Sequence, residues 1–314
     1  MSAAIDQPAA LANWTLSTTG DRLASRSDFC AGVGRAIGDG TGFAAGKLGV
    51  TERALLNHQL LLAGEHDARR IAAFEQSLAF KAGRQAGVFP VEANFLRTFS
   101  AWYAQRCHEL DFIGLVPESL EVLSRLFAFH GFDARLSEYR VQEPDMSERA
   151  EERPCYLPHL RGRTVLLVCP FAEVLRSRAD RATFERVWSK TGKQWFHPAE
   201  VKALELPYGF DPATQRRYPT VMSLFDELAE ALAAVDFDVA LIAAGGLGIP
   251  LAAAVKEQDK VAISLGGPLQ VLFGVLGERW RRRRSWQQCY FNRHWIDLPE
   301  RYRPDPRYTS ENYW

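Results

Sequence analysis

Residues 236–280 show the clearest pattern in the chain: DFDVALIAAGGLGIPLAAAVKEQDKVAISLGGPLQVLFGVLGERW. The runs 238–243 and 260–265 are short, apolar and rich in Val and Ile, which predicts two buried strands. Each strand is followed by glycines, a proline and a helical pattern, and this is the repeating unit of a parallel sheet. We therefore predict an α/β fold with a doubly wound, mainly parallel, Rossmann-like sheet flanked by helices.

The glycines that follow these two strands are candidates for binding a phosphate group. Backbone N–H groups can converge on an anion at a glycine turn, and the helix that follows adds a favourable dipole. In parallel sheets, ligands bind at the carboxyl ends of the strands. The alternative is that the glycines only permit tight turns. The spacing fits neither a Walker A loop nor a dinucleotide-binding fingerprint. The candidates are Gly245, Gly246, Gly248, Gly266 and Gly267, with Gln270 as a hydrogen-bonding side chain in the following helix.

Composition excludes several classes of protein. The 314 residues include 38 basic and 38 acidic side chains, so no overall charge favours nucleic acid, and we expect no nucleic-acid partner. The five cysteines form no C-x-x-C pair, which is typical of a reducing cytosol and argues against a structural zinc site. The first residues lack the pattern of a secretory signal, and we therefore expect a cytoplasmic protein.

The chain divides into three parts by composition. Residues 1–20 are predicted to form a flexible arm, 21–280 a single domain, and 281–314 an extended, proline-rich C-terminal arm. Within the domain, a mainly helical half (21–141) precedes a Rossmann-like half (155–280). Between them, the polar and proline-flanked segment 142–154 is predicted to be a linker or exposed loop.

Periodicity predicts further elements in both halves. Helices are expected at 21–37, 53–62, 67–83, 91–110, 117–130 and 220–235, and strands at 43–48, 133–141, 163–169 and 201–206. The strand 43–48 runs into a turn in which Thr51 is predicted to be the N-cap of the next helix. Glu52 would then lie in the first helical turn, where it either interacts with the helix dipole or serves a site.

One basic cluster stands out near the C-terminus: Arg279 and Arg281–Arg284, with aromatic residues interleaved after it. Such a cluster can bind a polyanion or an acidic lipid headgroup, so a peripheral membrane contact is one hypothesis. A solvated basic loop is the commoner explanation of such a pattern, and the neutral total charge favours it. No H-E-x-x-H or G-x-S-x-G motif supports a metalloprotease or a serine hydrolase.

Three short segments resemble the early landmarks of the GT-D-type glycosyltransferases. Residues 47–52 (KLGVTE) resemble the R-x-G-D-G-E-like turn after a strand, residues 87–90 (GVFP) the G-I-Y-P-like segment, and residues 111–114 (DFIG) the aspartate that follows a helix. The second half is similar to a group of GT-D-fold-like proteins through residues 162–171, 236–280 and 311–314. The resemblance covers most of residues 40–314.

The resemblance implies a glycosyltransferase that uses a nucleotide-sugar donor, in particular a UDP-sugar, and a divalent metal ion, Mn²⁺ or Mg²⁺. The acceptor would be a hydroxyl group on a glycan, a lipid carrier or a small molecule. Lys47, Gly49 and Thr51 would face the donor, Glu52 would be a catalytic residue and the metal ligand, and Asp111 is a candidate general base.

The chain departs from the family pattern at two positions of this turn. Val50 stands where the family has the aspartate of its D-x-E element, and Lys47 replaces the arginine. One carboxylate holds a divalent ion weakly, although donor phosphates supply further oxygens. Lys47 could instead neutralise the diphosphate directly.

Two alternatives to a transferase remain at this point. The chain could be a nucleotide- or phosphosugar-binding module without turnover, or an interaction protein that binds an anionic polymer or a membrane through the 279–284 cluster.

Overall fold

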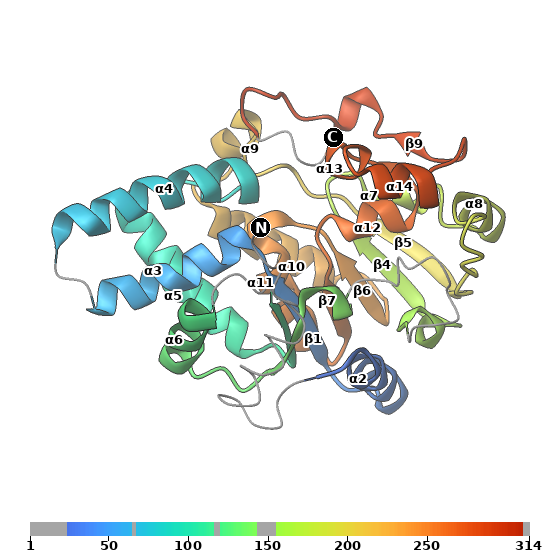
Figure 1. The fold of residues 1–314 in the computed structure, drawn as a ribbon, viewed down its shortest axis with the longest axis horizontal. Coiled ribbons are helices and arrows are strands. Elements are labelled where there is room, and N and C mark those ends of the chain that lie inside the picture. The colour runs from blue at the N-terminus through green and yellow to red at the C-terminus, as the bar shows by residue number, and fades with distance from the viewer. Residues whose placement is uncertain (1–23, 65–66, 116–119, 143–154, 310–314) are drawn as a thin grey trace, which may run out of the picture.

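The computed structural model describes residues 24–64, 67–115, 120–142 and 155–309, and its centre is one seven-stranded sheet (Figure 1). The order is β3-β2-β1-β7-β6-β4-β5, and every pairing between neighbours is parallel. The predicted Rossmann-like α/β fold is therefore confirmed. The strands are β1 (Phe43–Leu48), β2 (Phe112–Leu115), β3 (Arg135–Glu138), β4 (Thr164–Val168), β5 (Glu200–Leu204), β6 (Val239–Ile242) and β7 (Val261–Ser264).

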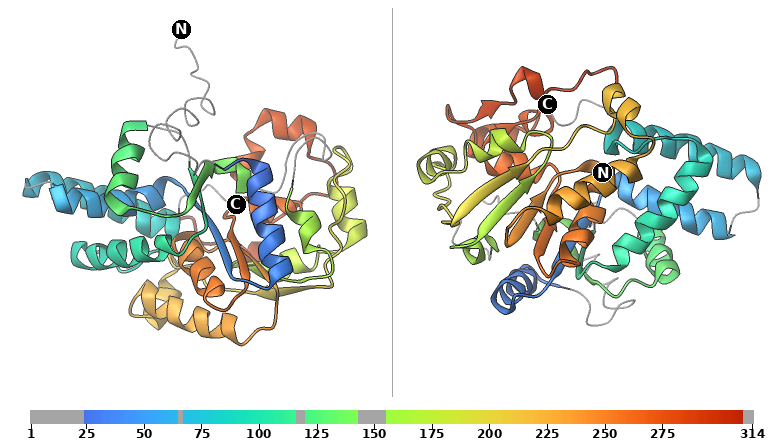
Figure 2. Two further views of the ribbon diagram at one scale, coloured as in Figure 1. Left: turned by 90° about the horizontal axis from the view of Figure 1, so that it is seen from below. Right: turned by 180° about the vertical axis from the view of Figure 1, so that it is seen from behind.

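Helices cover both faces of the sheet (Figure 2). On one face the core is formed with α3 (Val50–Gly64), α4 (Ala68–Ala86), α5 (Ala93–His108), α6 (Leu120–His130), α10 (Val221–Ala233) and α11 (Gly248–Lys256). The opposite face packs against α2 (Arg26–Asp39), α7 (Ala172–Arg176), α8 (Arg181–Val187), α12 (Pro268–Leu272) and α13 (Glu278–Arg281). Strand side chains alternate between these two cores, as the two-residue period of a strand requires.

The pattern at 236–280 folds as predicted, with β6 and β7 each leading into a glycine turn and a helix. The strand at 43–48 is β1, and the expected strand at 133–141 is the edge strand β3. Strand β2 was not predicted, because its four residues are too few to show a period. The predicted 1–20 arm, positions 143–154 of the loop, and residues 311–314 lie outside the described residues.

The segment after residue 280 differs from the extended arm that the sequence predicts. It contains α14 (Arg284–Cys289), the short strand β9 (Ile296–Asp297), which pairs with β8 (Val275–Leu276), and the 3-10 turn η5 (Glu300–Tyr302). Arg178 donates hydrogen bonds to the carbonyl groups of Phe273 and His294, at 2.6 and 2.7 Å, and thereby connects the two short strands to the main body.

A buried polar network joins α3, α4 and α5. The His58 ring lies 3.0 Å from Ser100 Oγ through Nδ1 and 3.1 Å from Glu75 Oε1 through Nε2, and Arg97 donates to the same carboxylate at 2.7 Å. The hydrogen bond from Arg97 lowers the pKa of Glu75, and burial lowers the pKa of His58. Because His58 and Ser100 are fully buried, this triad-like arrangement stabilises the helices and has no access to a substrate.

Close backbone packing ties the end of α4 to the loop before α9 (Pro212–Arg217). Gly87, the C-cap of α4, has φ +70°, and the backbone of Gly209 lies directly against it. A Cβ added at Gly209 would overlap the Gly87 carbonyl oxygen, which is part of the backbone and cannot rotate away. This contact holds α4 in a fixed position relative to the sheet.

We predict that Gly209→Ala lowers the free energy of unfolding by about 2 kcal/mol or more, because overpacking against backbone forces the chain to shift. Gly38→Ala is the matched control. Gly38 lies in α2 with no described atom within 4 Å of an added Cβ, so alanine should stabilise the helix by about 1 kcal/mol. Thermal and urea unfolding of the two variants measure the difference, and equal stabilities would contradict the packing argument.

Candidate functional site

Three turns lie together at the carboxyl edge of the sheet. Strands β1, β7 and β6 are neighbours, with Gly46 opposite Ser264 and Ser264 opposite Ile242. Because the strands are parallel, the turns that follow them lie side by side. The structure therefore brings together residues 47–52, the turn at Gly266 and Gly267, and the 3-10 turn η4 (Gly245–Leu247), as the sequence predicted.

Lys47 is a buried cation at the end of β1. Only 6% of its surface is exposed, and it lies level with Gly114 on the neighbouring strand β2. Strand alternation places its side chain on the same face as Phe43 and Ala45, which is the face covered by α2 and α12. A buried ammonium group requires polar partners that compensate for the loss of water. Lys47 has such a polar or electrostatic interaction within the protein.

Glu52 lies in the first turn of α3, and its side chain is half-buried. Burial raises the pKa of its carboxyl group above the ordinary value of 4.5, although the N–H groups of Glu52 and Gly49 and the cations Arg53 and Lys47 act in the opposite direction. A carboxyl group whose pKa is raised by burial and which interacts with cations is a candidate for accepting or donating a proton. The structure thus brings Lys47, Gly49 and Glu52 into one electrostatically coupled group.

Thr51 does not cap α3, and that prediction was wrong. The helix begins at Val50, so Thr51 is its second residue, and its side chain is buried. The Thr51 hydroxyl lies 3.4 Å from Gln85 Oε1 and faces the end of α4. Thr51 therefore connects two helices, because α3 begins at Val50, three residues before the predicted start at 53.

The glycines after β6 serve packing. A Cβ at Gly245 would lie 2.6 Å from the Ala86 carbonyl oxygen, and one at Gly246 would lie 2.8 Å from Val88 Cγ2. At Gly248 an added Cβ would lie 2.6 Å from Ser264 Oγ. These glycines let α4 and α11 approach the strand ends. Their role is therefore in tight turns and packing, which is the alternative to phosphate binding that the sequence left open.

The turn after β7 is different because it faces open space. Gly266 has φ +60°, and no described atom lies within 4 Å of a Cβ added there. Gly267 follows at the start of α12. Gln270, one turn on, is 3% exposed, and its Nε2 lies 3.5 Å from the Val275 carbonyl oxygen, so its amide interacts within the protein.

Asp111, the candidate base, does not lie at this edge. It precedes β2, so it lies at the amino edge of the sheet. Its carboxylate accepts hydrogen bonds from the Ala44 N–H and from Lys256 Nζ, both at 2.9 Å. These contacts join the start of β1 to the end of α11. Asp111 and Glu52 therefore lie at opposite edges of the sheet.

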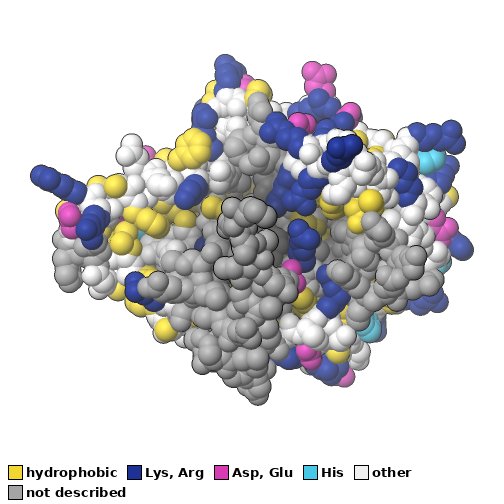
Figure 3. Space-filling view, in the orientation of Figure 1, with side chains coloured by type: hydrophobic (Ala, Val, Ile, Leu, Met, Phe, Trp, Pro, Cys, Tyr) yellow, Lys and Arg dark blue, Asp and Glu magenta, His cyan; other side chains and the backbone are white. Residues whose placement is uncertain are grey.

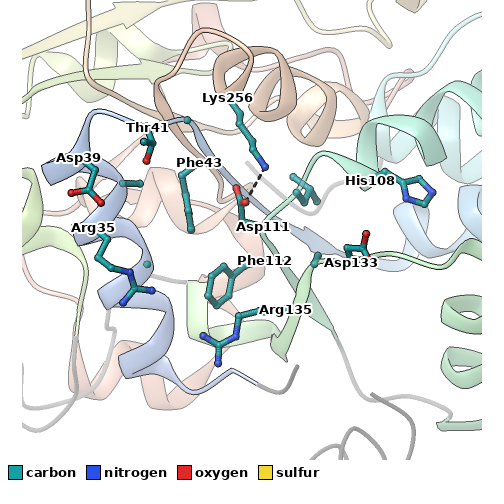
Figure 4. Close-up of a pocket in the computed structure, with 15 residues that line it drawn as sticks. Arg35, Asp39, Thr41, Phe43, His108, Asp111, Phe112, Asp133, Arg135 and Lys256 are labelled. Carbon is teal, nitrogen blue, oxygen red and sulfur yellow. Dashed lines mark hydrogen bonds and ion pairs between the residues drawn. The ribbon is translucent and has the colours of Figure 1, made fainter. Parts of the chain in front are cut away.

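Asp111 lines a shallow depression of about 540 Å³ at the amino edge (Figure 4). Cationic and anionic side chains alternate around it, and the Asp111–Lys256 ion pair crosses its centre. Arg135 lies 5.5 Å from the Phe112 ring centroid and pairs with Asp28 at 3.5 Å. Because the lining contains both cations and anions, three of them in ion pairs, the depression offers no concentrated charge of one sign to a ligand.

The C-terminal segment crosses the carboxyl edge, which sequence reasoning missed. Tyr208, in the loop after β5, donates to the Tyr302 carbonyl group at 2.9 Å. Further on, Arg84 of α4 donates to the Arg307 carbonyl group at 2.5 Å, and the Thr309 hydroxyl donates to the Arg84 carbonyl group at 3.3 Å. These contacts join residues more than 90 positions apart, so no local pattern could have indicated them.

The 279–284 cluster is less basic than its sequence indicates. Arg281 pairs with Asp297, and Arg282 pairs with Glu278 at 2.9 Å. Basic side chains gather on the face of the molecule drawn in Figure 3, near α13. Local pairing removes part of their charge, which supports the interpretation as a solvated surface.

The described residues hold no group of three or more His, Cys, Asp or Glu side chains arranged to bind a metal ion. Within the same part of the chain, every helix is either too short or too polar to cross a bilayer.

Comparisons with known proteins place the chain in no family. No protein-family model matches the sequence, and no curated protein matches it. Among solved structures, the selenomethionine-substituted structure of a domain of unknown function, DUF1792, has a TM-score of 0.43 and 11% sequence identity. That alignment covers 91% of this chain and 99% of the other. At this level of similarity the match carries no inference about function.

We predict that the pKa of Glu52 lies above 4.5 and rises further in Lys47→Met, because that variant removes a cation that favours the carboxylate. Carboxyl ¹³C chemical shifts followed over pH measure it, with Glu52→Gln to assign the signal. Lys260→Met at the start of β7, on the amino edge, is the control and should leave the pKa unchanged. A Glu52 pKa at or below 4.5 would contradict the burial argument.

Proposed function

We propose that this protein transfers a sugar from a nucleotide-sugar donor to a hydroxyl acceptor at the carboxyl edge of its sheet. The observation that carries the proposal is the meeting of buried Lys47, half-buried Glu52 and the open Gly266 turn at the ends of two neighbouring strands. A cation, a glycine turn with open space in front of it and a carboxyl group that can accept a proton suit such a transfer.

Lys47 and the turn at Gly266 would bind the diphosphate of the donor. The last paired residues of the two strands are Gly46 and Ser264, so Lys47 lies one residue after this pair in β1 and Gly266 lies two residues after it, beyond β7. An ammonium group and backbone N–H groups stabilise the negative charge that develops on a departing diphosphate. A UDP-sugar is the donor that the resemblance to GT-D-type enzymes favours.

Glu52 would act as the general base. The bond between the anomeric carbon and the diphosphate oxygen breaks, and the diphosphate leaves with the electron pair. A bond forms between the anomeric carbon and the acceptor oxygen, whose proton passes to the Glu52 carboxylate. Asp111 has no part in this step, because its carboxylate is bound to the Ala44 N–H and Lys256 at the opposite edge.

A divalent metal ion fits this site only in part. Among the described residues Glu52 belongs to no group of three or more potential metal ligands, so the donor phosphates would have to supply most of the oxygens. We therefore assign the charge neutralisation to Lys47 and derive no step from a metal ion.

Donor binding and turnover test the proposal together. We expect one nucleotide sugar from a panel of UDP-, GDP-, CDP- and TDP-sugars to raise the melting temperature, because a ligand of the native state stabilises it by mass action. Glu52→Gln should retain that shift and lose sugar transfer by about 100-fold or more, the contribution of a general base. Lys47→Met should weaken donor binding itself.

The same experiment separates the alternatives. A melting shift with no transfer to any acceptor, in the wild type as well as in Glu52→Gln, would indicate a nucleotide- or phosphosugar-binding module. No shift with any nucleotide sugar, with or without Mn²⁺, would contradict both functions. Asp111→Asn serves as a further control and should retain transfer.

The pH dependence provides an independent test. Because only ionised Glu52 accepts a proton, kcat/KM should fall as the pH falls through its raised pKa. The acidic limb should therefore lie above pH 4.5. In Lys47→Met the pKa of Glu52 should rise further, so the acidic limb of the residual activity should move to higher pH. A rate that stays constant from pH 8 down to pH 4.5 would exclude Glu52 as the base.

A further inference from the structure

Helix α4 presents one long face to solvent. Residues at intervals of three and four along the helix are exposed, and they form what we call the α4 outer face: Arg69, Ala72, Ala73, Gln76, Phe80 and Arg84. In Figure 1 the helix lies along the upper side of the group formed by α3, α4 and α5, and only its C-terminal end lies near α9 and the C-terminal segment. The opposite side packs on α3 and α5 through Leu78 and Ala82.

The α4 outer face carries Arg69 and Arg84, and Arg70 and Lys81 flank it on the same helix. The helix contains Arg69, Arg70, Lys81 and Arg84, and its one acidic residue, Glu75, is buried and bound to Arg97 and His58. The N-cap Asp67 offsets one charge, because it lies 3.9 Å from Arg70 Nε. A net positive charge therefore extends over a helix of 19 residues, about 28 Å long.

Exposed apolar side chains surround Arg84 at the end of this face. Phe80 is 55% exposed, Val91 39% and Tyr308 38%. The Arg84 guanidinium lies 5.9 Å from the Phe80 ring centroid, and Val91 lies against Gly83 of the same helix. The residues on either side of Tyr308 bond to Arg84, so the exposed Tyr308 lies close to the end of this face, with Arg307 5.5 Å from its ring centroid.

We propose that the α4 outer face, with Val91 and Tyr308, docks on an anionic lipid bilayer. Basic side chains interleaved with exposed aromatic rings match such a surface, because the cations bind lipid phosphates while the rings enter the boundary between headgroups and acyl chains. The exposed apolar side chains, and not the net charge, favour this region over the 279–284 cluster, where two of the five arginines have acidic partners.

The position of α4 relates this surface to the rest of the molecule. Its last residue, Ala86, packs against Gly245 at the carboxyl edge, and its Arg84 holds the C-terminal segment. Docking through α4 therefore brings the carboxyl edge close to the lipid headgroups. The docking surface goes beyond the proposed transferase function and does not depend on it.

Co-sedimentation of the full chain with vesicles tests the proposal without donor or acceptor. We expect binding to vesicles of phosphatidylglycerol and phosphatidylcholine, and little binding to phosphatidylcholine alone. Arg69→Glu with Lys81→Glu should weaken binding by about thirtyfold or more, and Phe80→Ala by about tenfold. High salt should weaken the wild type steeply.

Arg279→Glu with Arg284→Glu is the matched control, since it makes the same change in charge away from α4. It should leave vesicle binding within about twofold of the wild type. An equal loss in the control variant would overturn the assignment to α4, and so would a wild type that binds no anionic vesicles. Melting temperatures of all variants verify that they are folded.

Discussion

The close packing of α11 on β1 and β7 is the constraint on which the rest of the structure depends. A Cβ at Gly42 would overlap the Lys256 carbonyl oxygen, one at Gly46 would lie 2.6 Å from Ile249 Cγ1, and Gly248 lies against Ser264. Side chains at these positions would push the helix away from the sheet. Because β1 comes from the first half of the chain and β7 from the second, this contact joins the two halves.

Two groups of buried polar residues differ in what their surroundings permit. The His58–Glu75–Ser100 network is closed, with each partner satisfied by another side chain, so it can only hold helices together. Lys47 and Glu52 lie at the end of a strand, next to a glycine turn with open space in front of it. The open turn next to them, and not residue type, makes the second group the candidate site.

Several features of the site could be predicted from the sequence, and others could not. The alternation of apolar runs with glycine and proline predicts both turns after β6 and β7. The same pattern cannot distinguish Gly245 from Gly266, which have similar positive φ angles of 52° and 60°. Only the position of α4, whose Ala86 covers Gly245, leaves Gly266 as the open turn. Asp111 was proposed as a base because the four-residue strand after it showed no pattern, and without that strand its position at the amino edge of the sheet could not be recognised.

By itself, the sequence determined the parallel α/β class, the strand carrying Lys47 and the glycine turns, because these follow from local periodicity and backbone preference. The tertiary structure alone decided which turn is open, which carboxylate lies beside Lys47, and that the C-terminal segment reaches α4 through Arg84. Such contacts join positions far apart in the chain, and their geometry depends on how whole helices pack on the sheet. No local pattern encodes that packing.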